Sequence, residues 1–204
     1  MKKLIFLLAV SVLVSTNVIG QTLSIEQLGM TPKNGAYYKD NENLLNNFVG
    51  TWLYTTGNTS LKFVLKKVTR YNYNPNYSED LLVGEYEYIK NGVVEINTLN
   101  NINSTYIFSH SIHGNTVLYY DEKPPCNDCT VNEKRLRIIF EDPIKETAGD
   151  LFLRRVTVAG QQAISVQFLG DGFKYTGGPN VDNIVRTYVE ETVPNGVYVL
   201  IKQP

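Results

Sequence analysis

From Phe48 onward, hydrophobic residues recur at every second position over several stretches of the chain. This is the period of a β-strand, in which successive side chains point to opposite faces. Each such run predicts a half-buried strand whose apolar set faces a core. The clearest apolar sets are Leu61/Phe63/Leu65, Leu136/Ile138/Phe140, Ile164/Val166/Phe168 and Val197/Val199/Ile201.

Turn signals separate these runs. Asn91-Gly92 lies between the runs 82–90 and 93–99 and is typical of a two-residue hairpin turn, because both residues tolerate positive φ. After residue 47, no stretch has a helical period long enough for a crossover connection, and the runs predict about ten strands. Similar turn signals stand at Gly57-Asn58, His113-Gly114-Asn115, Ala159-Gly160, Asp171-Gly172 and Asn195-Gly196.

Consecutive strands joined by short turns predict an all-β, antiparallel, up-and-down meander. A meander of about eight to ten strands either closes into a barrel or folds into two stacked sheets. We expect a closed, lipocalin-like barrel, because one predicted strand carries large residues on both faces. In that strand Tyr86 and Tyr88 are backed by Val83 and Ile89.

The N-terminal segment has the three-part pattern of a secretion signal. Lys2 and Lys3 precede the apolar run Leu4–Val14, and the small polar residues Ser15–Asn17 follow. This order predicts a signal peptide over residues 1–20. The apolar run is too short to cross a bilayer, which takes roughly twenty helical residues. We therefore expect a secreted or periplasmic protein without a membrane span.

Residues 21–47 are polar and rich in Asn, and predict an extended lead-in. Near its end, Asp40 is a suitable N-cap for a short helix, with Glu42 in the first turn and Leu44-Leu45 as its apolar pair. Residues 48–204 then form the single β-barrel domain.

The segment Phe48-Val49-Gly50-Thr51-Trp52 resembles the opening of the calycin superfamily, which includes the lipocalins, fatty-acid-binding proteins and avidins. In those families the Trp of a Gly-x-Trp motif closes the bottom of the barrel against a basic residue from the far end of the chain. The resemblance implies this structural role for Gly50 and Trp52, with Arg186 or Lys202 as the basic partner. It does not imply biotin binding, because Trp52 is the only Trp in the chain. The alternative is an ordinary core aromatic residue after a glycine turn.

A second resemblance covers the whole chain after the signal segment. It is similar to a family of small secreted Bacteroidota proteins whose function is uncharacterised, which supports the compartment and the fold but implies no catalytic residues. The residues that carry it are the Asn-rich lead-in, Phe48–Trp52, the loop Pro124–Cys129 and the ending Val193–Gln203.

Charge and composition exclude some partners. The chain has 19 basic and 20 acidic residues, and the basic ones are scattered rather than clustered. Nucleic-acid-binding proteins show a clustered basic face. We therefore expect no nucleic-acid partner.

Cys126 and Cys129 are the only cysteines. Their spacing matches a redox motif, but that chemistry needs a helix N-terminus, and Lys134–Glu141 reads as a strand instead. A zinc site needs further ligands, and only the loop acids Asp121, Glu122 and Asp128 are near. In an oxidising compartment the pair predicts a structural disulfide.

Other candidate chemistry is weak, and we expect neither an enzyme nor a cofactor. His110 and His113 fall within a predicted strand, where a spacing of three places them on opposite faces, so they predict no metal site. Glu85 and Glu87 share a strand face at a separation that could imitate a glycosidase pair. Their alternation with Tyr86 and Tyr88 favours a solvated strand face.

Tyrosine is the strongest compositional signal, with 14 residues. A Tyr ring with its hydroxyl suits a pocket for a mixed apolar and polar ligand, or a protein-binding surface. Our leading hypothesis is a small, partly apolar ligand bound in the open end of the barrel, and the alternative is an extracellular interaction or structural domain whose Tyr-rich loop 71–77 meets another protein. The ligand hypothesis predicts lining residues Tyr86, Tyr88, Tyr106 and Tyr119.

Overall fold

The computed structural model describes residues 20–29, 31–74, 76–176 and 185–204, so the predicted signal peptide lies almost wholly outside the described residues. Among these residues no helix is both long and apolar enough for a membrane crossing.

The strands are β1 Thr22–Ser24, β2 Ala36–Lys39, β3 Gly50–Thr56, β4 Thr59–Asn74, β5 Tyr77–Lys90, β6 Val93–Asn97, β7 Ile112–Leu118, β8 Arg135–Asp142, β9 Thr147–Val158, β10 Gln161–Gly170, β11 Phe173–Thr176, β12 Val185–Tyr188 and β13 Gly196–Lys202. Short 3-10 helices are η1 Ile25–Gln27, η2 Leu45–Asn47, η3 Leu99–Asn103 and η4 Ile107–Ser109.

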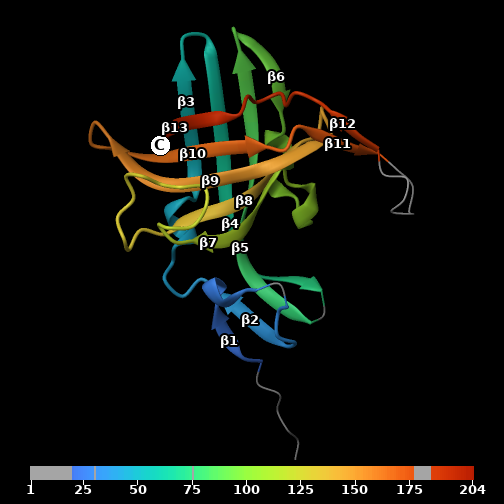
Figure 1. Cartoon of the computed structure of the whole chain (residues 1–204), viewed down its shortest axis with the longest axis vertical. Coiled ribbons are helices and arrows are strands. Elements are labelled where there is room, and N and C mark those ends of the chain that lie inside the picture. Colours follow the sequence, from blue (N-terminus) through green and yellow to red (C-terminus); the bar gives the residue numbers. More distant parts are fainter. Residues whose placement is uncertain (1–19, 30, 75, 177–184) are drawn as a thin grey trace, which may run out of the picture.

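The strands form a closed antiparallel barrel of eight, which confirms the predicted fold class. Its order is β3-β4-β5-β7-β8-β9-β10-β13, and β13 returns to β3. Figure 1 shows that β3, β4, β5 and β6 run across the direction of β8, β9, β10 and β13. The two groups join at two corners, β5 to β7 over Leu82–Gly84 and β3 to β13 at two residue pairs.

The interior of the barrel confirms most of the predicted strand faces. The apolar sets of β4, β8 and β10 are all at most 2% exposed. The set on β13 is wrong: Val197 and Val199 are 64% and 38% exposed, whereas Leu200 is fully buried. The register places Lys202 opposite Trp52, and this turns Leu200 and Tyr198 inward. A change of one residue in a strand reverses which face is buried.

Aromatic rings fill the middle of the barrel. Tyr86 lies 4.5 Å from Phe140 and 6.5 Å from Phe63 between ring centroids, and Phe140 lies 4.7 Å from Phe168. All four side chains are at most 1% exposed. Because these rings come from four different strands, they tie the two groups of strands together and occupy the interior themselves.

Trp52 closes the end of the barrel at which the β3 strand begins. Its Nε1 donates a 2.7 Å hydrogen bond to the Phe48 carbonyl, and the ring is fully buried. Lys202 Nζ lies 5.3 Å from the centre of the ring, within cation–π range. Gly50 has φ of 130°, and a side chain there would meet Lys202 Cε at 3.3 Å. Of the two candidate cations Lys202 is therefore the partner, since Arg186 lies over Phe173 instead.

The predicted helix near residues 40–47 is absent, and the one-turn 3-10 helix η2 stands in its place. Asp40 does accept hydrogen bonds from the backbone N–H groups of Leu44 and Leu45, as a capping residue would. Asn43, however, has φ of 55°. A residue in the left-handed conformation cannot be part of a right-handed helix. Only the single turn η2 after Asn43 is therefore helical.

Part of the lead-in joins the sheet rather than remaining an extended arm. β2 pairs in parallel with the beginning of β5, from Ala36 opposite Tyr77 to Tyr38 opposite Glu79, and β1 pairs in parallel with β2. Asp80 fixes this junction: one carboxylate oxygen accepts from the Tyr37 hydroxyl at 2.6 Å and the other from the Asp40 N–H at 3.0 Å.

Candidate ligand site at the open end of the barrel

A depression of about 250 Å³ lies at the end of the barrel opposite Trp52. The up-and-down order brings together the ends of β5 and β8 and the segment that leads into β13, and these supply its walls. The lining side chains are mostly charged or polar: Lys90, Glu95, Ile144, Lys145, Glu190, Glu191, Thr192 and Pro194. Charges of both signs at one rim suit a polar or zwitterionic group.

A pair of inward-facing tyrosines is linked to this depression through one rim residue, Pro194. Tyr54 and Tyr198 are half-buried and meet edge to face, with ring centroids 5.2 Å apart. The Tyr198 hydroxyl donates a 2.6 Å hydrogen bond to the carbonyl of Pro194, a residue of the rim. Burial raises the pKa of Tyr198 to about 12, and burial also raises the pKa of Tyr88, which lies on the inward face of β5 two positions before Lys90. Their hydroxyls are therefore neutral donors and acceptors at physiological pH.

Backbone hydrogen bonds hold the rim in place. Asp142 is 1% exposed, and one carboxylate oxygen accepts from the N–H groups of Ile144 and Lys145, each at 3.0 Å. Its other oxygen accepts from the Thr192 N–H at 2.7 Å. Glu191 Oε1 accepts from the Gly172 N–H at 2.7 Å. The buried Thr192 hydroxyl has no hydrogen-bond partner within the described part of the chain.

Comparison with known proteins places the whole chain in one family. The model of a family of unknown function, DUF6705, matches residues 1–203. The chain belongs to DUF6705. Comparison with curated proteins and with solved structures found no significant match.

The tyrosines predicted to line a ligand site do not come together in this DUF6705 barrel. Tyr86 is fully buried within the aromatic core, and Tyr88 is 4% exposed beside the open end. Tyr106 and Tyr119 are 59% and 45% exposed and lie away from the interior, Tyr106 before η4 and Tyr119 after β7, where its hydroxyl donates to Glu26. None of the four lines the depression, although Tyr88 lies two positions before its lining residue Lys90 on β5.

Sequence reasoning missed Tyr54 and Tyr198. Tyr54 follows Trp52 at the inward-facing spacing of two, and Tyr198 stands two positions before the buried Leu200. The signal for Tyr54 was available once Trp52 was placed inside the barrel. The signal for Tyr198 was hidden, because the valines on either side of it form the more regular apolar pattern.

The Tyr-rich loop of the alternative hypothesis is partly folded into the molecule. Tyr77 lies edge to face on Tyr38, with ring centroids 6.0 Å apart, and Tyr71 packs on an outer cluster with Leu81 and Val83. These two rings therefore pack against other residues of the DUF6705 fold.

Glu85, predicted on a solvated face, is fully buried outside the barrel wall. The segment from η3 to η4 covers this face of β5. Glu85 Oε1 lies 2.9 Å from His110 Nδ1, and His110 Nε2 lies 3.2 Å from the Ser104 carbonyl. His113 is also buried, and its Nδ1 donates to the His110 carbonyl at 3.3 Å. Within the described ranges, no group of three His, Cys, Asp or Glu side chains converges as a metal site.

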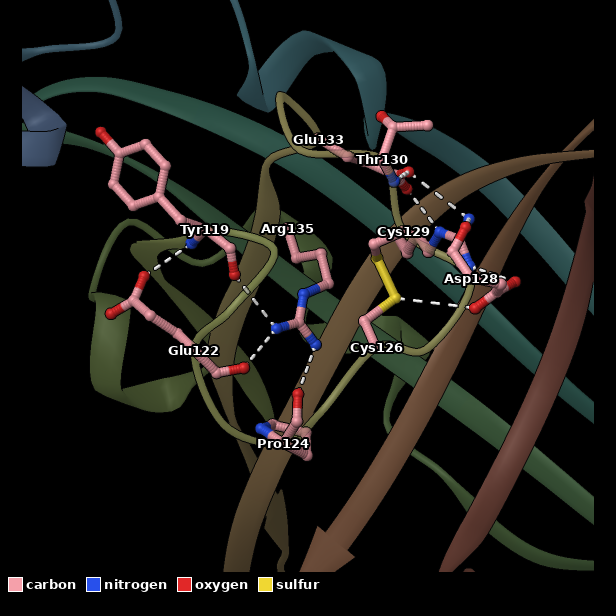
Figure 2. Close-up of a disulfide and its surroundings, with 10 residues drawn as sticks. Tyr119, Glu122, Pro124, Cys126, Asp128, Cys129, Thr130, Glu133 and Arg135 are labelled. Atoms are coloured by element: carbon pink, nitrogen blue, oxygen red, sulfur yellow. Dashed lines mark hydrogen bonds and ion pairs between the residues drawn. A yellow bond between two sulfur atoms is a disulfide. The ribbon is translucent and has the colours of Figure 1, made fainter.

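Cys126 and Cys129 form the predicted disulfide. Figure 2 shows Arg135 reaching into the loop before it, where its guanidinium donates to the carbonyls of Tyr119, Glu122 and Pro124. By loop entropy, so short a ring contributes about 2 kcal/mol at most. The buried arginine and the disulfide therefore pin this loop rather than the whole barrel.

Proposed function

We propose that this DUF6705 protein is an exported, calycin-like binding protein, not an enzyme, which takes a small, partly apolar ligand at the open end of its barrel. The proposal rests on a difference in packing between the middle of the barrel and its open end. Packed aromatic rings fill the middle, whereas at the open end half-buried Tyr54 packs on Tyr198, and the Tyr198 hydroxyl donates to Pro194 at the rim of a charged depression.

The calycin part of the proposal is supported by the closed end. Gly50, Trp52 and Lys202 make the contact that the resemblance implies, with the glycine leaving space for the lysine stem beside the indole. Export is supported by the disulfide, which persists in oxidising compartments, and by the signal-like N-terminal sequence.

The size and chemistry of the site limit which ligands can bind. A depression of about 250 Å³ is slightly smaller than common ligand pockets, which hold roughly 300–1,000 Å³, so the ligand is small and stays partly exposed. The edges and faces of Tyr54 and Tyr198 suit a ring or another flat apolar group. Lys90, Lys145 and the rim carboxylates suit polar groups at the other end of the same molecule.

Anilinonaphthalene sulfonate, an aromatic anion that fluoresces in apolar sites, is a direct probe of this surface. We expect saturable fluorescence enhancement with the wild-type protein. The double variant Tyr54→Ala/Tyr198→Ala is expected to weaken binding by roughly tenfold or more, since each aromatic contact contributes about 0.5–1.5 kcal/mol beyond its buried area.

Tyr106→Ala and Tyr119→Ala are the matched controls, because both remove an exposed tyrosine away from the open end. They are expected to leave the affinity unchanged. An affinity that falls equally in both sets of variants, or no enhancement at all, would contradict the proposed site.

A further inference from the structure

The corner between β3 and β13 is barely paired. Their antiparallel ladder consists of Ile201 opposite Leu53 and Lys202 opposite Trp52, and Gln203 N–H then donates to the Thr51 carbonyl at 2.8 Å. From Gly196 to Leu200, β13 pairs with β10 on one side and with no described strand on the other.

The direction of the unpaired backbone groups follows from that last hydrogen bond. In an antiparallel strand both polar groups of one residue point to the same neighbour, and the side alternates along the chain. Because Gln203 points toward β3, Val199 and Val197 also point their N–H and C=O groups to the β3 side. Tyr198 and Leu200 point theirs toward β10. The free edge of β13 therefore presents two donors and two acceptors from these valines.

The opposite corner of the barrel is filled. Beside β7, β5 carries β2 along its first residues and β6 along its last ones, so short strands of the chain itself cover this edge on both sides of the corner. No described strand does the same for β13. An edge of this kind accepts a further strand.

The edge also lacks the usual protection against strand addition. Natural edge strands are blunted by Lys, by Pro or by bulges. Between Gly196 and Ile201 the sequence has neither a charged residue nor Pro, and the β13–β10 register is continuous. Val197 and Val199 are 64% and 38% exposed on its outer face, beside the free backbone groups.

We propose that an uncharged, extended segment of a partner protein adds to β13 as a strand along Val197–Val199. The backbone of the segment supplies the hydrogen bonds, and its outward residues are β-branched or apolar to pack beside the two valines. The β3–β4 hairpin extends beyond β13 in Figure 1. The added segment would therefore lie beside β13 as one further strand and cross this hairpin. This interaction uses backbone groups of β13, whereas the small-ligand site uses the side chain of Tyr198 on the same strand.

Hydrogen exchange of the free protein tests the edge itself. The amides of Val197 and Val199 are expected to exchange much faster than those of Tyr198 and Leu200, which point to β10. Equal protection of all four amides would overturn the proposal, because it would show that the edge is already paired.

Binding is tested with a panel of capped seven-residue peptides of alternating valine and threonine, followed by amide chemical shifts. We expect saturable binding with the largest shifts at Thr55, Val197 and Val199. Val199→Pro removes one donor facing the corner and leaves the β10 ladder intact, and it is expected to weaken binding by roughly tenfold or more. Val199→Thr keeps the N–H and the β-branched shape and is expected to bind as wild type.

Val199→Lys serves as a second variant if circular dichroism shows that the proline variant does not fold, and it is also expected to weaken binding. Three outcomes would overturn the proposal: no shift with any peptide, shifts centred on β6, or proline and lysine variants that both bind as tightly as the wild type. A concentration-dependent dimer that Val199→Pro abolishes would overturn it in favour of a second copy as the occupant.

Discussion

Replacing Trp52 with alanine is expected to lower the free energy of unfolding by about 3–5 kcal/mol, the cost typical of removing a large buried aromatic side chain. The indole is fully buried at the closed end, and it contributes a hydrogen bond to the Phe48 carbonyl and a cation–π contact with Lys202. Its loss leaves a cavity between β3, β13 and η2. Urea denaturation followed by far-UV circular dichroism measures the effect without relying on the lost fluorophore.

Two control variants separate the contributions of Trp52. Trp52→Phe keeps an aromatic ring but loses the Nε1 donor, and it is expected to cost clearly less than the alanine. Lys202→Met keeps the stem and removes the charge, and it is expected to cost about 0.5–2 kcal/mol, the range of a cation–π contact. If Trp52→Ala changes stability by less than about 1 kcal/mol, a closing role for this residue is contradicted.

Replacing His110 with alanine is expected to destabilise the protein by about 3–5 kcal/mol, the cost of breaking a buried ion pair by removing one partner. Both ring nitrogens of His110 face oxygen atoms, and the Ser104 carbonyl is only an acceptor, so Nε2 donates. The contact from Nδ1 to Glu85 then requires one further proton held between the two groups. Glu85 Oε2 has no hydrogen-bond partner in the described part of the chain. The His110→Ala variant therefore leaves a fully buried carboxylate without a partner.

A double-mutant cycle distinguishes this pairing from simple loss of packing. Glu85→Met/His110→Leu replaces the pair with apolar groups, and it is expected to be more stable than His110→Ala because no charge is left unpaired. Glu87→Gln, two positions along the same strand face but only half-buried, is the matched control and is expected to change stability little. Additive effects of Glu85→Met and His110→Leu would contradict the pairing.

The fold could be predicted from the sequence because most strands carry one clearly apolar face. Local sequence is enough to predict the alternation on β4, β8 and β10 and the turn at Asn91-Gly92, because tertiary contacts do not override it there. Cys126 and Cys129 were predictable for a similar reason, because two cysteines three residues apart in a loop have a short path to each other.

The open end could not be predicted because it depends on register. β13 has large side chains on both faces, and only its pairing of Lys202 with Trp52 turns Tyr198 rather than Val197 and Val199 inward. The environment of Glu85 depends on a covering segment that arrives after β6, which no local pattern on β5 records. Asn43 stopped the predicted helix through a backbone conformation that the sequence permits but does not require.

We propose that the open end binds a small molecule, while the rest of the barrel is filled by its own side chains. Native mass spectrometry tests it most directly, using protein purified from its own host without denaturation and the same protein after refolding. We predict an additional mass of small-molecule size on the native protein, which refolding removes and which Tyr54→Ala/Tyr198→Ala protein lacks. Identical masses before and after refolding would contradict the claim.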